Sequence, residues 1–341
     1  MKQAVNMPCL VCGSGDSRLL HALSYPDQHY PGLFEMRECA GCGLLFNSPR
    51  LSDAEIARLY DADYYVFQER ERDAARRVAL LASQTLGVAA HYCEARDVLE
   101  LGCAKGYLLA QLRAQGWQVR GVELAAAAAD FARQRFGLDV YAGTLAQALA
   151  QPGFQPASVL LCTDVIEHVP APLALLQDMR RALKPRGWLV LGTPNADADQ
   201  RRALGPRWLG FNPFHIFLFN RANLGRLLEQ AGFELVRAYT YANDDPPQPA
   251  TTRWRDAIRD RLRDRLRETL RASGLLPVLR RARAGMLALA DSPVSLQGLQ
   301  AELASGQLPA LHSYAASADA RSARGAACRG DNLVLIARAR S

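Results

Sequence analysis

The sequence predicts an α/β fold with a doubly wound sheet, and three observations support this prediction. The segment DVLELGCAKGY, from Asp97 to Tyr107, reads as a strand, a glycine turn and the start of a helix. From Arg96 onward, apolar strand-like segments alternate with helix-like segments. The 341 residues are 49% hydrophobic and 22% charged, which is typical of a globular protein with one large or two small domains.

The glycine turn is the most informative element. An apolar strand ends at Leu101, and Gly102 and Gly106 allow the backbone to bend and to approach a ligand closely. The helix that follows presents free amide groups, which favour an anionic or polar ligand. The complete dinucleotide motif G-x-G-x-x-G is absent because Ala104 stands at the second glycine. A tight turn without a ligand therefore remains the alternative.

Three later segments extend the same pattern. The strand Gln118–Glu123 ends in a carboxylate 21 positions after Gly102, where it can bind ribose hydroxyls. The segment VLLCTDVIEHVP, from Val159 to Pro170, is an apolar strand that runs into a polar cluster. The segment LKPRGWLVLGTPN spans Leu183–Asn195. The polar cluster consists of Asp164, Glu167 and His168.

These four segments resemble the motifs of class I S-adenosylmethionine-dependent methyltransferases, which read E-x-G-x-x-x-G, V-E, D-V-I-E-H-V and L-K-P-x-G. Order and spacing both match over residues 95 to 241, and the last ten residues join them. The resemblance implies a Rossmann-like seven-stranded sheet, S-adenosylmethionine as cofactor and methyl transfer as the reaction. Two departures are Cys103-Ala104-Lys105 inside the glycine turn and Arg186 at the first glycine of L-K-P-G-G.

In a doubly wound sheet, ligands bind beyond the carboxyl ends of the strands where the strand order reverses. We therefore expect the first and fourth strands to flank the cofactor. The resemblance implies that Glu123 binds the ribose hydroxyls, that Leu124 lines the adenine pocket and that residues 143 to 145 close it. The full set of expected cofactor-binding residues is Glu100, Gly102, Cys103, Gly106, Glu123, Leu124, Thr144, Thr163, Asp164 and Val165.

Two histidines are candidate catalytic residues. Methyl transfer from a sulfonium mainly requires alignment of donor and acceptor, and a hydroxyl acceptor also requires a base. His168 is the first candidate base, with helix capping or loop fixation as its alternative role. We expect His215 to orient or deprotonate the acceptor. Nearby aromatic residues form either a wall of the substrate site or the core of a long loop. They are Trp208, Phe211, Phe214, Phe217 and Phe219.

Two C-x-x-C-G motifs near the N-terminus predict a metal site. Cys9 and Cys12 form the first pair, Cys39 and Cys42 form the second, and each pair is followed by a glycine. Four thiolates match a structural zinc site, which leaves no open coordination position for catalysis. Four reduced cysteines without a metal are the alternative. The 26 residues between the pairs are expected to contain a small hairpin.

The expected domain organisation has four parts. Residues 1–50 form the zinc-binding module, and residues 51–94 form a helical linker or lid. The methyltransferase core comprises residues 95–242 together with 331–341. An Arg-rich, mainly helical insertion occupies residues 243–330, before the last strand.

The insertion carries the charge of the chain. Residues 253–283 contain 11 arginines and 4 acidic residues, so their net charge of +7 equals that of the whole chain. Apolar residues at four-residue steps predict an amphipathic helix there. Residues 253–290 are suited either to peripheral contact with an anionic membrane or to packing on the enzyme through acid-to-arginine pairs. The apolar stripe consists of Trp254, Ile258, Leu262, Leu266 and Leu270.

Three functions remain open at this point. The leading one is methyl transfer to a small-molecule or glycan acceptor, and the resemblance extends to enzymes of bacterial surface polysaccharide biosynthesis. An RNA methyltransferase is the second, but the fourth strand lacks the D/N-P-P-Y/F motif and the basic segment offers only Trp254 for stacking. Nucleic acid is therefore not the expected partner. The third is a non-catalytic scaffold, against which Gly102, Gly106 and Glu123 argue.

The expected location is the cytoplasm. The sequence contains no run of eighteen apolar residues, and its N-terminus lacks the apolar stretch of a signal peptide. Cysteine pairs of the metal-binding type also fit a reducing compartment. The basic insertion extends this expectation to peripheral attachment at the inner face of the membrane.

Overall fold

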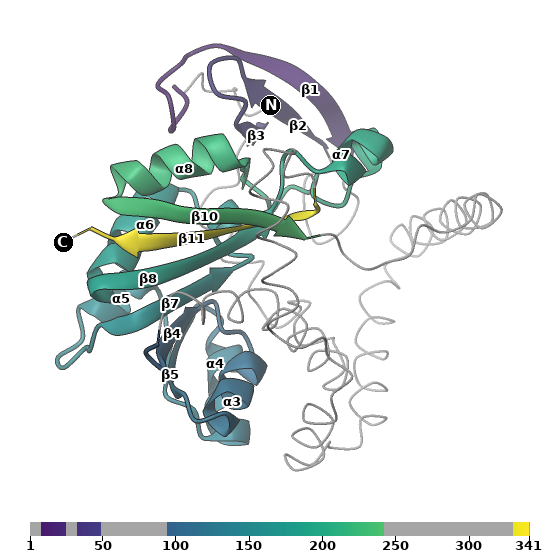
Figure 1. Ribbon diagram of the computed structural model, residues 1–341. Coiled ribbons are helices and arrows are strands. Elements are labelled where there is room, and N and C mark those ends of the chain that lie inside the picture. Colours follow the sequence, from purple (N-terminus) through teal and green to yellow (C-terminus); the bar gives the residue numbers. More distant parts are fainter. Residues whose placement is uncertain (1–7, 25–32, 49–93, 242–329, 341) are drawn as a thin grey trace, which may run out of the picture.

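The computed structural model describes residues 8–24, 33–48, 94–241 and 330–340 (Figure 1). These residues form a seven-stranded sheet and a four-stranded sheet. The predicted α/β fold with a doubly wound seven-stranded sheet is confirmed. Within the described ranges, no helix has the length and apolar character needed to cross a membrane. The predicted linker at 51–94 lies outside the described residues, except for Glu94. The predicted Arg-rich helix at 253–290 lies entirely outside them.

The larger sheet has the strand order β10-β11-β8-β7-β4-β5-β6. Its strands are β4 (Asp97–Leu101), β5 (Gln118–Glu123), β6 (Val140–Ala142), β7 (Ala157–Thr163), β8 (Leu183–Pro194), β10 (Phe233–Tyr241) and β11 (Asn332–Ala339). Its helices are α3 (Tyr107–Ala114), α4 (Ala126–Phe136), α5 (Leu145–Leu149), α6 (Pro172–Arg181) and α8 (Arg221–Gln230). A further short helix, α7 (Asp199–Leu204), follows β8.

The strand order reverses between β4 and β7, as the sequence predicts. The chain runs from β4 to β5 and β6 on one side, then returns to place β7 parallel to β4 on the other. Val98 pairs with Val159, and Leu101 pairs with Cys162. The carboxyl ends of β4 and β7 therefore meet at the position where ligands bind in this class of fold.

The final strand, β11, is an internal strand of the larger sheet. β11 lies antiparallel between β8 and β10, with Leu335 opposite Leu191 and opposite Ala238. At one end of this ladder, Tyr241 pairs with Asn332. The chain thus leaves the sheet after Tyr241 and returns to it at Asn332, at adjacent points.

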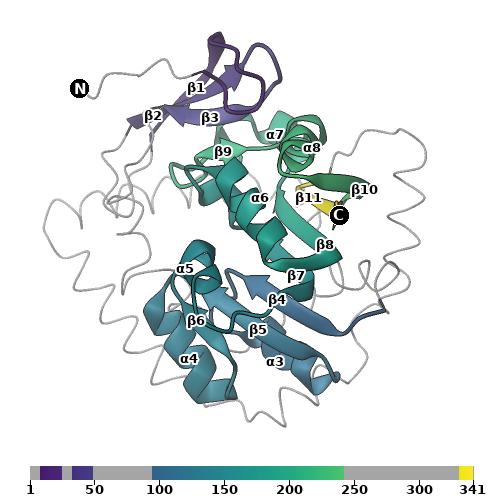
Figure 2. The same ribbon diagram turned by 90° about the vertical axis from the view of Figure 1, so that its left-hand side faces the viewer.

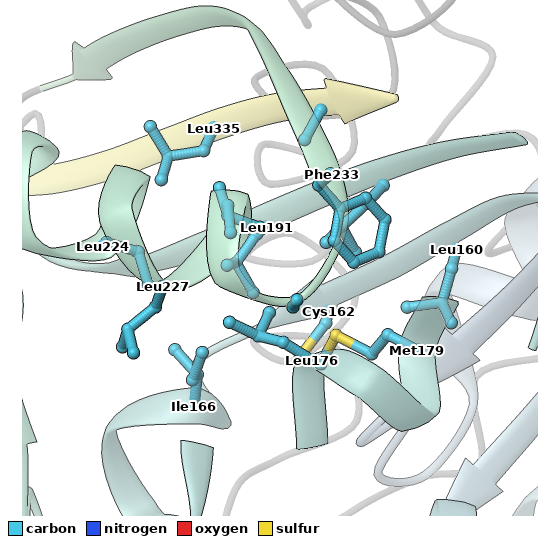
Figure 3. Packing of buried hydrophobic residues seen from close by; sticks show 14 of the residues in the cluster. Leu160, Cys162, Ile166, Leu176, Met179, Leu191, Leu224, Leu227, Phe233 and Leu335 are labelled. Atoms are coloured by element: carbon cyan, nitrogen blue, oxygen red, sulfur yellow. The ribbon is translucent and has the colours of Figure 1, made fainter. Parts of the chain in front are cut away.

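Helices cover both faces of the sheet. α5, α6 and α8 pack on one face, and α3 and α4 pack on the other (Figures 1 and 2). Figure 3 shows the first face, where Leu176 and Met179 of α6 and Leu227 of α8 meet the buried Cys162 and Leu191 of the strands. Strands that are buried on both faces read as continuous apolar runs. This burial explains the segment VLLC in β7.

The smaller sheet joins the N-terminal residues to the core. It contains β1 (Ser17–Ser24), β2 (Leu33–Cys39), β3 (Leu45–Ser48) and the two-residue strand β9 (Phe217–Leu218), in that order (Figure 2). β1 and β2 form the hairpin that was predicted between the cysteine pairs. β9 comes from the segment that follows β8, so residues far apart in the sequence share one sheet.

This shared sheet shows that four of the five aromatic residues pack in the core instead of forming a substrate wall, whereas Phe214 is half-buried. Trp208 and Phe211 are buried against Met36 and Leu45 of the N-terminal sheet. Phe217 and Phe219 are completely buried in the main core. Their position in the sequence indicates only that they are near His215, whereas the burial of apolar area between the two sheets determines their packing.

Candidate cofactor and acceptor site

The turn after β4 has a backbone that requires glycine. Gly102 and Gly106 have φ angles of 77° and 76°, in the left-handed region. A Cβ atom at Gly102 would lie 2.5 Å from Cγ2 of Val165, and one at Gly106 would lie 2.7 Å from Cδ1 of Leu138. Ala104, at the missing second glycine, also has a left-handed φ of 47°. The turn therefore keeps a glycine-type conformation at all three positions.

Glu123 ties the end of β5 to this turn. Its Oε2 accepts a hydrogen bond from the backbone N–H of Ala104 at 2.8 Å, and its Oε1 accepts one from Ala125 at 2.8 Å. The side chain is buried, which raises the pKa of Glu123, while the backbone hydrogen bonds act in the opposite direction. Leu124, the next residue, is 48% exposed and free to line a pocket.

Glu100 lies in β4, and Cys103 lies in the turn that follows this strand. Glu100 is buried, and its Oε2 has no hydrogen-bond partner in the described part of the chain. Burial, together with the negative charge of Glu123, raises the pKa of Glu100 to about 8. Cys103 is buried in the apolar core beside Gly121, so its thiol packs inward, and its carbonyl accepts a hydrogen bond from the N–H of Gly106 at 2.8 Å.

The opposite wall begins where β7 ends. Thr163 is the last residue of β7, and Asp164 has a left-handed φ of 54°, while its N–H donates to the carbonyl of Gly192 at 3.1 Å. Val165 follows and packs close to Gly102. This contact brings the predicted residues of the two walls together across the switch point.

Thr144 lies on the third side of this region, after β6. Its hydroxyl accepts a hydrogen bond from the N–H of Gln147 at 3.2 Å and caps α5. The preceding Gly143 donates its N–H to the carbonyl of Glu123 at 2.8 Å. The loop after β6 is therefore held directly against the end of β5, where the cofactor-binding residues were expected.

The structure brings the two candidate histidines together. The rings of His168 and His215 have centroids 4.9 Å apart and meet edge to face at 60°. His168 Nδ1 lies 2.9 Å from the carbonyl oxygen of Phe214, and His215 Nδ1 lies 2.8 Å from that of Gly210. Burial lowers the pKa of both rings, and that of His215 to about 3. His215 is therefore neutral at physiological pH.

Glu167 and Asn47 are two residues of this region that sequence reasoning did not assign. Glu167 is fully buried beside His168, in the 3₁₀ helix at Ile166–His168. Asn47 lies in β3 and donates to the carbonyl of Pro213 at 2.8 Å. The motif D-V-I-E-H-V includes Glu167, whereas nothing in the sequence near Asn47 indicates its contact with a loop that lies 166 residues away.

The four N-terminal cysteines form one cluster, with all sulfur atoms within 4.8 Å of one another. Sγ of Cys9 lies 3.6 Å from Sγ of Cys42, and Sγ of Cys12 lies 3.5 Å from Sγ of Cys39. A tetrahedral zinc ion with Zn–S bonds of about 2.3 Å separates its sulfur ligands by about 3.8 Å. The cluster is therefore compatible with structural zinc.

Both cysteine pairs use the same turn. The N–H of Gly13 donates to the carbonyl of Cys9, and the N–H of Gly43 donates to that of Cys39. These glycines have φ angles of 74° and 71°. The glycine after each C-x-x-C pair thus supplies the left-handed backbone that directs two thiols to one point.

Comparison with known proteins identifies the family. The model of a methyltransferase domain matches residues 66–238, just over half of the chain. The chain therefore belongs to this methyltransferase family, and its sheet and glycine turn are those of a class I S-adenosylmethionine-dependent methyltransferase.

Two curated relatives are similar over part of their length. A probable S-adenosylmethionine-dependent methyltransferase of Mycolicibacterium smegmatis is 35% identical over 148 residues, which cover 43% of this chain and 55% of the relative. A ubiquinone biosynthesis O-methyltransferase of Paraburkholderia xenovorans is 35% identical over 106 residues, which cover 29% and 45%. The chain thus spans about half the length of these relatives.

Among solved structures, a SAM-dependent methyltransferase from Archaeoglobus fulgidus matches with a TM-score of 0.45 and 14% identity, over 80% of this chain and 96% of that one.

Proposed function

We propose that this protein transfers a methyl group from S-adenosylmethionine to a small-molecule acceptor. One observation carries the proposal. The Glu123 carboxylate accepts a hydrogen bond from Ala104 in the left-handed glycine turn after β4, at the switch point of a doubly wound sheet. A carboxylate at this position is suited to ribose hydroxyls, and the turn provides close backbone approach to the rest of the cofactor. Membership in the methyltransferase family supports the same cofactor.

Residues at the carboxyl ends of β4, β5, β6 and β7 would contact different parts of the cofactor. In this proposal, Glu123 binds the ribose, Leu124 and Thr144 flank the adenine, and Gly102 and Gly106 admit the backbone close to the methionine part. The remaining contacts come from Glu100, the backbone of Cys103, Thr163, Asp164 and Val165. The half-exposed side chain of Leu124 supports its part in this assignment, because a fully packed leucine offers no surface to adenine.

The acceptor that we propose is a hydroxyl group of a small molecule. The curated relatives include enzymes named as O-methyltransferases of ubiquinone biosynthesis. His168 and His215 lie beyond the carboxyl end of β7, and we propose that they orient or deprotonate the acceptor. A glycan of surface polysaccharide biosynthesis is the second acceptor class, and it rests on the sequence resemblance alone.

The roles of the other parts of the chain follow from this assignment. We propose that residues 1–50 form a structural zinc module, that 51–94 form a linker or lid and that 243–330 are an insertion in the core of 95–242 and 331–341. A cytoplasmic location, with residues 253–290 at an anionic membrane face, completes the proposal. The basic charge of the insertion supports this last point.

Calorimetric titration with S-adenosylmethionine and S-adenosylhomocysteine tests the cofactor assignment. Glu123→Ala should abolish binding, whereas Glu229→Ala, at an exposed acid on α8, should bind like the wild type. Binding that persists in Glu123→Ala would overturn the ribose assignment. A wild-type protein that binds neither compound would favour the scaffold interpretation, and tight, salt-sensitive binding of RNA would favour the RNA methyltransferase.

Acceptor screening tests the second half of the proposal. Purified protein is incubated with methyl-labelled cofactor and with phenolic small molecules or nucleotide sugars. His215→Ala should then retain the wild-type cofactor affinity while turnover falls. Unchanged turnover in this variant would remove His215 from the acceptor site.

A further inference from the structure

Three ligand-type side chains meet beyond the end of β7. Glu167 and His168 lie on the 3₁₀ helix at Ile166–His168, and His215 lies on the loop before β9. One ligand atom from each residue lies within 4.8 Å of the other two. Nε2 of His168 is 3.8 Å from Oε1 of Glu167. These side chains come from two segments that are distant in the sequence, and the fold directs them to one point.

The two imidazole rings are held in the same tautomer. The carbonyl oxygens of Phe214 and Gly210 can only accept hydrogen bonds, so the Nδ1 atoms of His168 and His215 carry the protons that are donated to them. The side-chain amide nitrogen of Asn212 also lies 3.1 Å from Nδ1 of His215, but it donates to the carbonyl of Leu209, and the Gly210 carbonyl at 2.8 Å is the closer partner of the ring. Each neutral ring then has its lone pair on Nε2. Metal-binding histidines characteristically donate their other N–H to a backbone carbonyl or a carboxylate, which fixes the tautomer and the ring orientation.

Glu167 contributes a buried carboxyl group with one unused oxygen. Its Oε2 accepts a hydrogen bond from the hydroxyl of Thr193 at 3.0 Å. Its Oε1, the atom that faces His168, has no hydrogen-bond partner in the part of the chain that the structure describes. A fully buried oxygen without a partner is costly. A cation bound to Oε1 would satisfy it.

We propose that Glu167, His168 and His215 bind a divalent first-row metal ion through one carboxylate oxygen and two Nε2 atoms. Bonds of about 2.1 Å would bring the ligand atoms to about 3.0 to 3.4 Å from one another, so binding draws the 3₁₀ helix and the loop together. Three protein ligands leave coordination positions open. This site is separate from the four-cysteine cluster and has different ligand chemistry.

The role of the ion rests on the proposed methyl transfer. The open positions would receive the acceptor hydroxyl, whose proton is released to water when its oxygen binds the ion. The oxygen then forms a bond to the methyl carbon, the S–CH₃ bond breaks, and its electron pair stays on sulfur. The histidines act in this scheme as ligands that position the acceptor.

Manganese is the appropriate probe, because carboxylate and imidazole ligands accept Mn²⁺ whereas thiolate sites select zinc. The zinc-loaded full chain is titrated with Mn²⁺, and free Mn²⁺ is measured by electron paramagnetic resonance. We expect one ion per chain in the wild type and an affinity reduced by more than about 100-fold in Glu167→Gln and in His215→Ala. His21→Ala, outside the cluster in β1, should bind like the wild type.

A second measurement uses the wild-type protein alone. Bound Mn²⁺ should broaden the imidazole NMR signals of His168 and His215 at concentrations that leave His21 sharp. Absence of Mn²⁺ binding, or equal binding by all variants, would overturn the metal site. Mn²⁺ binding without S-adenosylmethionine binding would retain the metal site and reject the proposed function. S-adenosylmethionine binding without Mn²⁺ binding would retain the proposed function and reject the metal site.

Discussion

The side-chain amide of Asn47 donates a hydrogen bond of 2.8 Å to the backbone carbonyl of Pro213, two residues before His215. The same amide nitrogen lies 3.2 Å from the carbonyl of Asn212, and the backbone N–H of Asn47 donates to Ile216. Asn47 thus contacts the loop of His215 on both sides of that residue. The N-terminal sheet therefore helps to position a side chain of the proposed acceptor site.

Replacing Asn47 should weaken this contact. Asn47→Ala removes a buried amide and leaves the carbonyl of Pro213 unsatisfied, so we expect a loss of about 1 to 3 kcal/mol in the free energy of unfolding. Affinity for S-adenosylmethionine should stay unchanged, because the Glu123 carboxylate is held by the backbone of Ala104 and Ala125. Urea unfolding and calorimetry measure the two quantities. Ser48→Ala, on the same strand, is the control, and equal destabilisation of both variants would contradict the prediction.

Alanine substitutions at two glycines should distinguish the cost of a left-handed backbone from the cost of a steric clash. Gly102 and Gly116 both have positive φ, but a Cβ at Gly116 meets nothing within 4 Å, whereas one at Gly102 meets Val165. Gly116→Ala should cost about 1 to 2 kcal/mol from the left-handed backbone alone. Gly102→Ala should cost more and should also weaken cofactor binding. Thermal unfolding and calorimetry test this, and similar losses of stability in the two variants would contradict it.

Stability should depend on pH through Glu100. Its pKa is about 8 in the folded protein and 4.5 in its ordinary state, so the folded protein binds this proton more tightly than the unfolded chain does. The contribution of Glu100 is complete below pH 4.5 and is lost as the pH rises through about 8.

Glu100→Gln should remove this pH dependence. Between the two pKa values, the wild type should lose up to roughly 1.4 kcal/mol of stability per pH unit relative to the variant. Urea unfolding of both proteins across this window measures the difference. Parallel pH profiles would show that burial does not perturb Glu100.

Removal of zinc should affect the N-terminal sheet first. Cys12→Ser should reduce the zinc content and lower the melting temperature, because a structural metal contributes directly to folding. A zinc-selective chelator should have the same effect on the wild type and none on the variant that has lost its zinc. Elemental analysis and calorimetric melting measure both. Cys103→Ala, at a buried thiol outside the cluster, should retain the full zinc content.

The core of the fold was predictable because local patterns determine it. Apolar strands, the glycines at 102 and 106 and the acid at 123 each report on their own element, and their order specifies the α/β alternation. The return of the chain at Asn332 was predictable for the same reason, since its alternating and apolar residues read as a strand. The left-handed backbone at Ala104 was not, because alanine rarely adopts it.

Contacts between distant segments account for what the sequence analysis missed. β9 contains only two residues and is a strand because β3 pairs with it. Two residues are too few for a periodic pattern that would predict a strand. Trp208 and Phe211 were interpreted by their proximity to His215, but the apolar side chains of the N-terminal sheet cover them. The sequence does not indicate that His168 and His215 meet, and only the folded chain brings them and Glu167 into one cluster.

The pairing of Tyr241 with Asn332 places the two ends of the intervening segment opposite each other on neighbouring strands. Neighbouring antiparallel strands lie only about 5 Å apart, so a short hairpin turn can join them as well as a long excursion can. We therefore expect β10 and β11 to keep their register when this segment is lengthened, shortened or exchanged. The same geometry offers a direct route to a minimal enzyme, in which a tight turn links the two strands.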